Sequence, residues 1–232
     1  MRSADSGERR VPMLLKSVVD RKGITLIELM VALVISGIVI GAVYRLFIAQ
    51  TRAYGLQDQV VEIQQNVRSA MEVLLRDLRM AGCDDDNTIG KPSLVPMVTP
   101  VASNAITVSY RYYDQNNALN RVTAAYTLVG TDLQRQLTLN GVGNPAEVIL
   151  PNVNSFILTY GIDADGNRIV DDQNGNGIVD TGDYVDAGAV GASRVISVRV
   201  QLAANPSPSN PDAVAQVSPR RLDSVVTLRN LL

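Results

Sequence analysis

The sequence of 232 residues contains no histidine and a single cysteine, Cys83. The absence of histidine removes the commonest general base and the commonest metal ligand of proteins. One cysteine cannot form an intramolecular disulfide. The sequence also lacks the G-x-S-x-G, Walker and Rossmann patterns of common enzyme sites. We therefore expect a protein that is not an enzyme.

An excess of basic charge is also lacking. Lys and Arg number 21 against 23 Asp and Glu, which gives a formal net charge of -2. The surface field that attracts nucleic acid is therefore not expected, and we predict no nucleic-acid partner. The length suits one sizeable domain with an appendage.

The most distinctive segment is "RKGITLIELMVALVISG", residues 21–37. From Ile24 to Val43 the chain has twenty residues with one charge, Glu28. A helix of this length spans about 30 Å, the thickness of the hydrocarbon core of a membrane. Residues 1–23 carry six basic and three acidic side chains, a net +3, which keeps this end in the cytoplasm. No small-residue cleavage site follows the apolar run, so we expect the run to be retained.

Glu28 is unusual because a carboxylate at this depth costs a few kcal/mol unless it is paired. In one interpretation the segment is a plain signal anchor, and Glu28 lies near enough to the interface to be tolerated. In the other, cleavage after Gly23 creates a free α-amino group on Ile24, and that charge pairs with Glu28.

This segment resembles the class III signal of type IV pilins and of type II secretion pseudopilins. The resemblance implies that a prepilin peptidase cuts after Gly23 and that the new N-terminus, Ile24, is methylated. It implies that Glu28, the fifth mature residue, meets the N-terminal amine of a neighbouring subunit during assembly. Position one is Ile here, where the family most often has Phe.

The helical pattern continues beyond the membrane segment. Apolar residues recur at spacings of three and four along one face: Val60, Ile63, Val67, Met71, Leu74 and Leu78. Gly82 breaks the pattern. We expect one helix over 24–81, divided into a transmembrane or filament-core part, 24–43, and an amphipathic part, 44–81.

The remainder, 82–232, predicts a β-rich globular head. Six short alternating runs are expected to be strands: 105–113, 121–129, 133–139, 155–162, 194–202 and 223–231. No helical period of useful length returns. The fold class is therefore α+β, with a long N-terminal helix packed on an antiparallel sheet.

The head resembles the PilW group of minor pilins, on the residues "LLRDLRMAG", "RVISVRVQLAA" and "VVTLRN". The J-type pseudopilins of type II secretion are close relatives in layout. This resemblance implies a minor subunit that primes assembly or lies at the filament tip.

An acidic loop, 163–184, has the spacing of a calcium loop. One twelve-residue frame places oxygen ligands at positions 1, 3, 5, 7, 9 and 12: Asp172, Asn174, Asn176, Ile178, Asp180 and Asp183. A second frame begins at Asp163 and has Arg168 where glycine is wanted. Four further residues are candidates for the same ion or for a second one: Asp163, Asp165, Asn167 and Asp171. The alternative is a solvated hairpin loop, which the same composition favours.

The expected function is that of a minor pilin, a structural subunit that primes or caps a type IV pilus-like filament. A type II secretion pseudopilin and a membrane-anchored, calcium-dependent adhesin or binding module stay open as alternatives. The expected partners are other pilin subunits, prepilin peptidase and inner-membrane lipid. The expected location is the bacterial inner membrane, with one span and a periplasmic or extracellular head, and then the filament or its tip.

Overall fold

The computed structural model describes residues 23–83, 98–209 and 211–228. The expected leader therefore lies outside the described residues except for Gly23, and so do residues 229–231 of the last expected strand. The chain divides into two compact units, Met1–Thr51 and Arg52–Leu232.

The helix α1 extends from Leu26 to Met80, 55 residues, close to the expected 24–81. It begins after Thr25, whose hydroxyl oxygen accepts a hydrogen bond from the backbone N–H of Glu28 at 3.3 Å, as an N-cap residue does. It ends before Gly82, which has φ +74°. Glycine takes this left-handed conformation without steric cost, and it closes the last turn.

The part of α1 in the first unit exposes every side chain, including apolar residues all around the helix. A helix that is apolar on all sides is stable in lipid or inside a larger assembly, because water would solvate it poorly. The apolar stretch of α1 is long enough to cross a membrane, and none of it is buried in the protein.

In the second unit α1 buries the predicted apolar stripe. Five of its six members are buried, Ile63, Val67, Met71, Leu74 and Leu78, and Val60 is half-buried, so the predicted amphipathic face is confirmed. The structure adds neighbours that the spacing did not single out: Ala70, Leu75 and the acidic Asp77.

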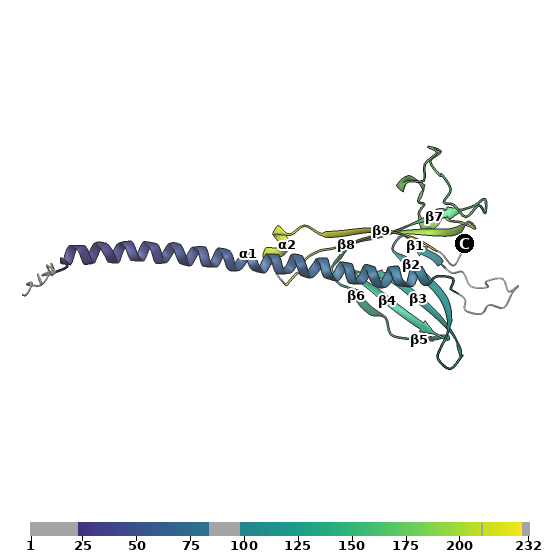
Figure 1. The fold of residues 1–232 in the computed structure, drawn as a ribbon, viewed down its shortest axis with the longest axis horizontal. Helices are drawn as coiled ribbons and strands as arrows, with labels where there is room; N and C mark the ends of the chain where they lie inside the picture. Colours follow the sequence, from purple (N-terminus) through teal and green to yellow (C-terminus); the bar gives the residue numbers. More distant parts are fainter. Residues whose placement is uncertain (1–22, 84–97, 210, 229–232) are drawn as a thin grey trace, which may run out of the picture. The chain divides into compact units, whose positions relative to one another are not determined.

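Two antiparallel sheets, rather than the single sheet expected, form the rest of the head (Figure 1). The first has the order β1-β2-β3-β4-β5, with β6 also paired to β4, and the second has the order β7-β8-β9. The first sheet is made of β1 Val98–Ala102, β2 Ala105–Tyr113, β3 Leu119–Val129, β4 Asp132–Leu139, β5 Val142–Gly143 and β6 Glu147–Leu150. The second is made of β7 Val153–Asp163, β8 Arg194–Ala204 and β9 Arg220–Thr227.

The last strand is displaced from its expected position. β9 begins at Arg220, three residues before the expected 223, directly after Pro219. Proline has no backbone N–H to donate to a ladder, so the strand starts beyond it. Three short helical segments were not predicted either: η1 Thr181–Asp183, η2 Ala187–Ala189 and α2 Pro211–Gln216.

The core of this unit contains side chains from α1 and from both sheets. Tyr126 of β3, Tyr160 of β7 and Leu74 of α1 are among its largest fully buried members. Polar groups also cross it: the Arg135 guanidinium of β4 donates to the carboxylate of Asp77 at 2.7 Å, and the Tyr126 hydroxyl of β3 donates to it at 2.6 Å. The second half of α1 is thus a structural member of the head.

Candidate functional site

The residues at the expected cleavage point lie in non-helical chain just before α1. Gly23 and Ile24 are both exposed, and a Cβ placed on Gly23 would meet no atom within 4 Å. Peptidases act on extended, accessible chain, because a bond inside a helix would first have to be unwound. The Gly23–Ile24 bond is accessible and lies outside the helix.

Glu28 lies in the first turn of α1, and its side chain is exposed. Its carboxylate has no hydrogen bond or ion pair to any described residue. Backbone N–H groups at a helix N-terminus favour a negative charge, so this position reduces the cost of Glu28 in lipid. The sequence pattern Thr25-x-x-Glu28 is that of a capping box and could have revealed Thr25 as the N-cap.

The comparisons with known proteins concern this segment. Residues 20–44 match the prokaryotic N-terminal methylation motif. The chain carries a prepilin-type signal. No curated protein matches the sequence. The motif together with the single long apolar helix supports a pilin-like subunit anchored in the inner membrane. The match ends at residue 44, so it bears on the signal and not on the head.

The acidic loop joins β7 to β8 and projects from the end of the second sheet (Figure 1). Three contacts tie it to that sheet. Val185 and Tyr160 exchange two backbone hydrogen bonds at 2.8 and 2.9 Å. The N–H of Asp171 donates to the carbonyl of Ile162 at 2.9 Å. Most residues of the loop are exposed, but its path is fixed by the sheet.

Close packing also anchors the loop to the sheet, in addition to these three hydrogen bonds. A Cβ on Gly161 of β7 would lie 2.9 Å from Cγ2 of Val170 and 3.1 Å from Cβ of Ser197. Val170 belongs to the loop, so glycine at 161 lets the loop pack directly on the strand. No sequence pattern predicts this contact, because Gly161 and Val170 belong to different elements and share no motif.

The loop contains a repeat that the overlapping calcium frames obscured. Residues 163–171, "DADGNRIVD", are followed at once by 172–180, "DQNGNGIVD". Six of the nine positions are identical: Asp163/Asp172, Gly166/Gly175, Asn167/Asn176, Ile169/Ile178, Val170/Val179 and Asp171/Asp180. A search for self-similarity at a period of nine would have found it.

The two repeats fold alike. Asp163 accepts from the backbone N–H groups of Gly166 and Asn167 at 2.7 and 3.1 Å. Asp172 accepts from Gly175 and Asn176 at 2.7 and 3.2 Å. These hydrogen bonds close two successive tight turns of the same form.

Arg168 adopts the backbone conformation that the calcium-loop pattern reserves for glycine. It has φ +69°, and the equivalent Gly177 has φ +81°. Arginine pays a steric cost in this region that glycine does not. Its N–H donates to Asp163 at 3.1 Å, as that of Gly177 donates to Asp172 at 2.6 Å. The departure from the glycine pattern therefore leaves the turn intact.

The carboxylates gather most closely in the first repeat. Asp163, Asp165 and Asp171 each place one oxygen so that all three lie within 4.8 Å of one another. Oxygens that share a calcium ion at 2.3–2.6 Å are up to about 5 Å apart, so this spacing fits the ion. Asp172, Asp180 and Asp183 do not form such a group among the described residues.

Asp163 and Asp183 are the two buried carboxylates of the loop. The backbone N–H of Asp180 at 2.7 Å, with those of Gln173 and Asn174, holds the pKa of Asp183 below its usual range. For Asp163, burial acts to raise the pKa, but donors led by the N–H of Arg168 outweigh it and lower the pKa. Both groups are therefore anionic at neutral pH.

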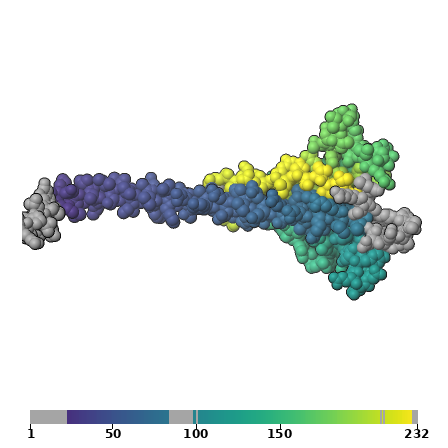
Figure 2. All heavy atoms as spheres, in the orientation of Figure 1, coloured from purple at the N-terminus to yellow at the C-terminus, as the bar shows by residue number. Residues whose placement is uncertain are grey.

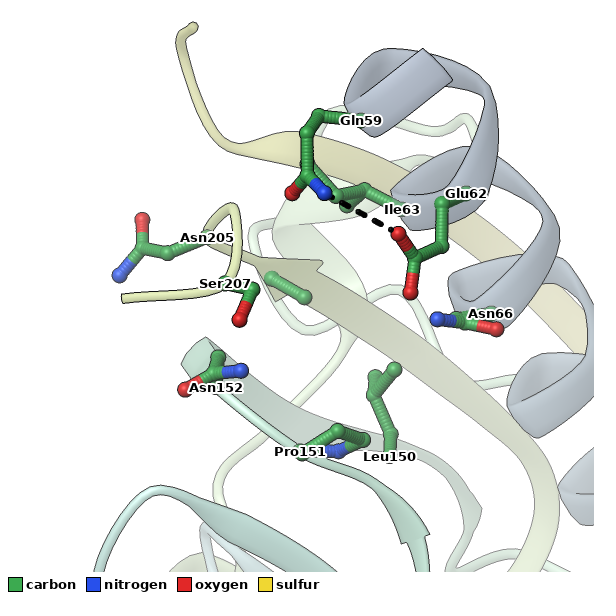
Figure 3. Close-up of a pocket in the computed structure, with 10 residues that line it drawn as sticks. Gln59, Glu62, Ile63, Asn66, Leu150, Pro151, Asn152, Asn205 and Ser207 are labelled. Atoms are coloured by element: carbon green, nitrogen blue, oxygen red, sulfur yellow. Dashed lines mark hydrogen bonds between the residues drawn. The ribbon is translucent and has the colours of Figure 1, made fainter. Parts of the chain in front are cut away.

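A small pocket lies between α1 and the turn between β6 and β7 (Figure 3). Its volume is about 110 Å³, and amide side chains such as Asn66 and Asn152 face it. Glu62 is its one carboxylate, and it accepts a hydrogen bond from Gln59 at 3.3 Å. A hydrolase of the carboxylate type needs two facing carboxylates, and this pocket does not provide them.

Proposed function

We propose that this protein is a minor pilin, a structural subunit that primes or caps the assembly of a type IV pilus-like filament. The observation that carries the proposal is the prepilin-type signal at residues 20–44 at the start of a single apolar helix. The α+β head with antiparallel sheets is consistent with a pilin-like fold.

In this proposal prepilin peptidase cuts the exposed Gly23–Ile24 bond and the amine of Ile24 is methylated. The carboxylate of Glu28, which has no partner among the described residues, then pairs with the Ile24 amine of a neighbouring subunit. An unpaired charge in lipid is costly, so this pairing favours assembly over the free membrane form. The same charge selects the register in which the helices dock.

We also propose that the acidic loop binds calcium. In the first repeat the ligands are the oxygens of Asp163, Asp165, Asn167 and Asp171. In the second they are those of Asp172, Asn174, Asn176 and Asp180, with the Ile178 carbonyl and Asp183. The support is the spacing of the carboxylates in the first repeat and the identical turns of the second. Calcium takes six to eight oxygen ligands, which carboxylates, amides and carbonyls supply.

The test of the main proposal has two measurements on one strain. Mass spectrometry of the membrane-extracted protein should give an N-terminus at methylated Ile24, and an intact leader in a host with active prepilin peptidase would contradict it. Quantitative immunoblotting of sheared filaments should find the protein at a few copies per filament. Absence from pili, with recovery in a secretion pseudopilus, would favour the type II secretion alternative.

Retention of the uncleaved chain as a membrane monomer would instead favour an anchored adhesin. The two measurements therefore separate all three functions. Deleting the gene supplies the background signal for both.

A further inference from the structure

A groove with a volume of about 450 Å³ lies on the head between α1 and the start of β9. Three arginines line it, Arg68 from α1 and Arg220 and Arg221 from β9, together with the apolar side chains of Val61 and Leu222. We call it the basic groove. Figure 2 shows the C-terminal segment, in yellow, directly against the blue helix.

The arginines of the basic groove lack acidic partners. None of the three forms an ion pair within 4.0 Å with another described residue. The nearby Asp223 pairs instead with Arg199 at 2.6 Å, although the charge of Arg221 contributes to lowering the pKa of Asp223.

The Nε atom of Arg220 is shielded from solvent and has no hydrogen-bond partner among the described residues. A shielded donor without an acceptor is destabilising. A carboxylate is the acceptor that best matches a guanidinium group. The groove is therefore suited to an acidic occupant.

The acidic loop has the complementary character. Between residues 163 and 183 it has six Asp and one Arg, a net charge of -5. Asp165, Asp172 and Asp180 are exposed. Two apolar side chains at equivalent positions of the repeats are exposed as well, Ile169 by 61% and Ile178 by 67%. Both side chains are available to contact a partner.

The loop and the basic groove lie at opposite ends of the second sheet. Arg194, the first residue of β8, lies opposite Asp163 in the β7–β8 ladder, at the base of the loop. Leu202, near the other end of β8, pairs with Leu222 of the groove. Eight residues of strand separate the two ends by about 26 Å. Val185 and Tyr160 tie the loop to its own end of the sheet, away from α2 and the start of β9 (Figure 1). It therefore does not reach the groove of its own chain.

We propose that the basic groove binds the acidic loop of a second copy of this chain. In the calcium-free form the exposed carboxylates of the loop lie opposite the three arginines, and Ile169 and Ile178 pack on Val61 and Leu222. The contact joins two different surfaces, so it is head-to-tail and can link the few copies expected in one filament. This inference rests on the proposed function in one respect, namely that a membrane or a filament holds the copies side by side.

The test uses two full-length variants with different tags, co-expressed on a Cys83→Ser background. One has Gln65→Cys in the groove and the other has Val179→Cys in the loop. Mild oxidation of membranes in a chelator should give a disulfide-linked heterodimer. The matched control replaces the loop variant by Val142→Cys, an exposed valine of the first sheet. Equal cross-linking in the control pair would overturn the proposal.

Charge reversal tests the electrostatic part. Arg68→Glu with Arg221→Glu in the groove variant should lower the heterodimer yield about fivefold or more. Arg52→Glu with Arg121→Glu, at exposed arginines outside the groove, should leave the yield unchanged. Adding Asp165→Lys to the loop variant should restore part of the lost yield. A yield that is insensitive to groove reversal would also overturn the proposal.

The N-terminus is measured in the same samples. A processed Ile24 without heterodimer contradicts the groove contact and leaves the proposed function standing. A heterodimer with an intact leader contradicts the proposed function alone. Melting of the Cys83→Ser background at the wild-type temperature confirms that its fold is intact.

Discussion

Glu28 combines a position that favours its charge within one chain with a proposed role between chains, and two different measurements report on them. Its charge lies in the first turn of α1, where backbone N–H groups favour it, and in the proposed assembly it also pairs with the amine of Ile24. The first role acts within one chain, and the second requires a neighbour.

Glu28→Ala should remain in the membrane, because removing a charge only eases insertion into lipid. It should nevertheless enter filaments poorly, and we expect at least a tenfold loss in sheared filaments measured by immunoblot. Glu28→Asp, which keeps the charge on a shorter side chain, serves as the matched control and should lose less. Incorporation of the alanine variant at the wild-type level would show that the pairing is dispensable.

Asp77 is a buried charge whose partners come from two strands far along the chain. It accepts from the Tyr126 hydroxyl at 2.6 Å and from Nε and Nη2 of Arg135 at 3.0 and 2.7 Å. Burial and the hydrogen bond to Asp77 raise the pKa of Tyr126, so the phenol stays protonated and donates. The cluster fixes the rotation of α1 against the first sheet.

Asp77→Ala should therefore leave the Arg135 guanidinium without its carboxylate partner, with the neutral Tyr126 hydroxyl at 3.0 Å as its remaining acceptor. Removing one partner of a buried pair costs about 3 kcal/mol, which corresponds to a fall in Tm of roughly 6–12 °C for a unit of this size. Circular dichroism of the full chain in detergent measures it. Asp223→Ala, which breaks the more exposed pair with Arg199, should cost about 1 kcal/mol or less. Equal effects of the two substitutions would contradict the role assigned to Asp77.

At the scale of elements, the acidic loop shows how a short repeat builds its own geometry. Each repeat closes its turn with hydrogen bonds between its first aspartate and its own backbone, and the sheet holds both ends. The loop is therefore ordered by the chain, and calcium would add charge neutralisation to turns that already exist.

Calorimetry should detect calcium binding in the millimolar range, because extracellular calcium modules bind on the order of 10⁻⁴–10⁻³ M. At tenfold excess of free ion over Kd, the protein should gain about 1.4 kcal/mol of stability over the chelated form. Asp165→Ala addresses the first repeat and Asp180→Ala the second, and Asp186→Ala, outside the repeats, is the control. If each single variant halves the stoichiometry, two ions bind. Equal melting of the wild type in calcium and in chelator would reduce the stretch to a solvated loop.

At the scale of the whole molecule, the chain combines two units that are suited to different surroundings. In the described part of the first unit, α1 exposes its apolar side chains, which suits lipid or a filament interior, whereas the second unit contains the hydrophobic core. The core residues of α1 begin at Ile63, inside the second unit. The head should therefore keep its core when the first unit is removed.

A chain that starts at Arg52 should be soluble without detergent and unfold cooperatively, because it retains the whole buried stripe of α1. A chain that starts at Ala81 should aggregate, because both sheets lose the helix that covers them. Size-exclusion chromatography and thermal melting measure both outcomes. Aggregation of the Arg52 chain would show that the first unit contributes to folding of the head.

Features that depend on neighbours along the chain were predictable from the sequence alone. The apolar run, its single charge and the glycine before it set the prepilin-type signal within 25 residues, and spacings of three and four predicted the buried face of α1. The strand 105–113 was predicted at its observed bounds, because its alternation and flanking turns are local as well. The turns of the acidic loop follow from Asp, Asn and Gly a few residues apart. The nine-residue repeat of this loop is likewise visible in the sequence.

Contacts between residues far apart in the chain were not predictable from the sequence and are seen in the folded structure. The strands form two sheets, and both sheets pack on α1. The alternation within any one strand does not indicate to which sheet that strand belongs. Asp77 is buried with a carboxylate oxygen that accepts from Tyr126 and Arg135, which lie 49 and 58 residues further along the chain. The acidic loop and the basic groove lie at opposite ends of β8 because of strand register, which is set by packing across the sheet. Long-range pairing depends on the free energy of the whole core, and that quantity is not contained in any one segment.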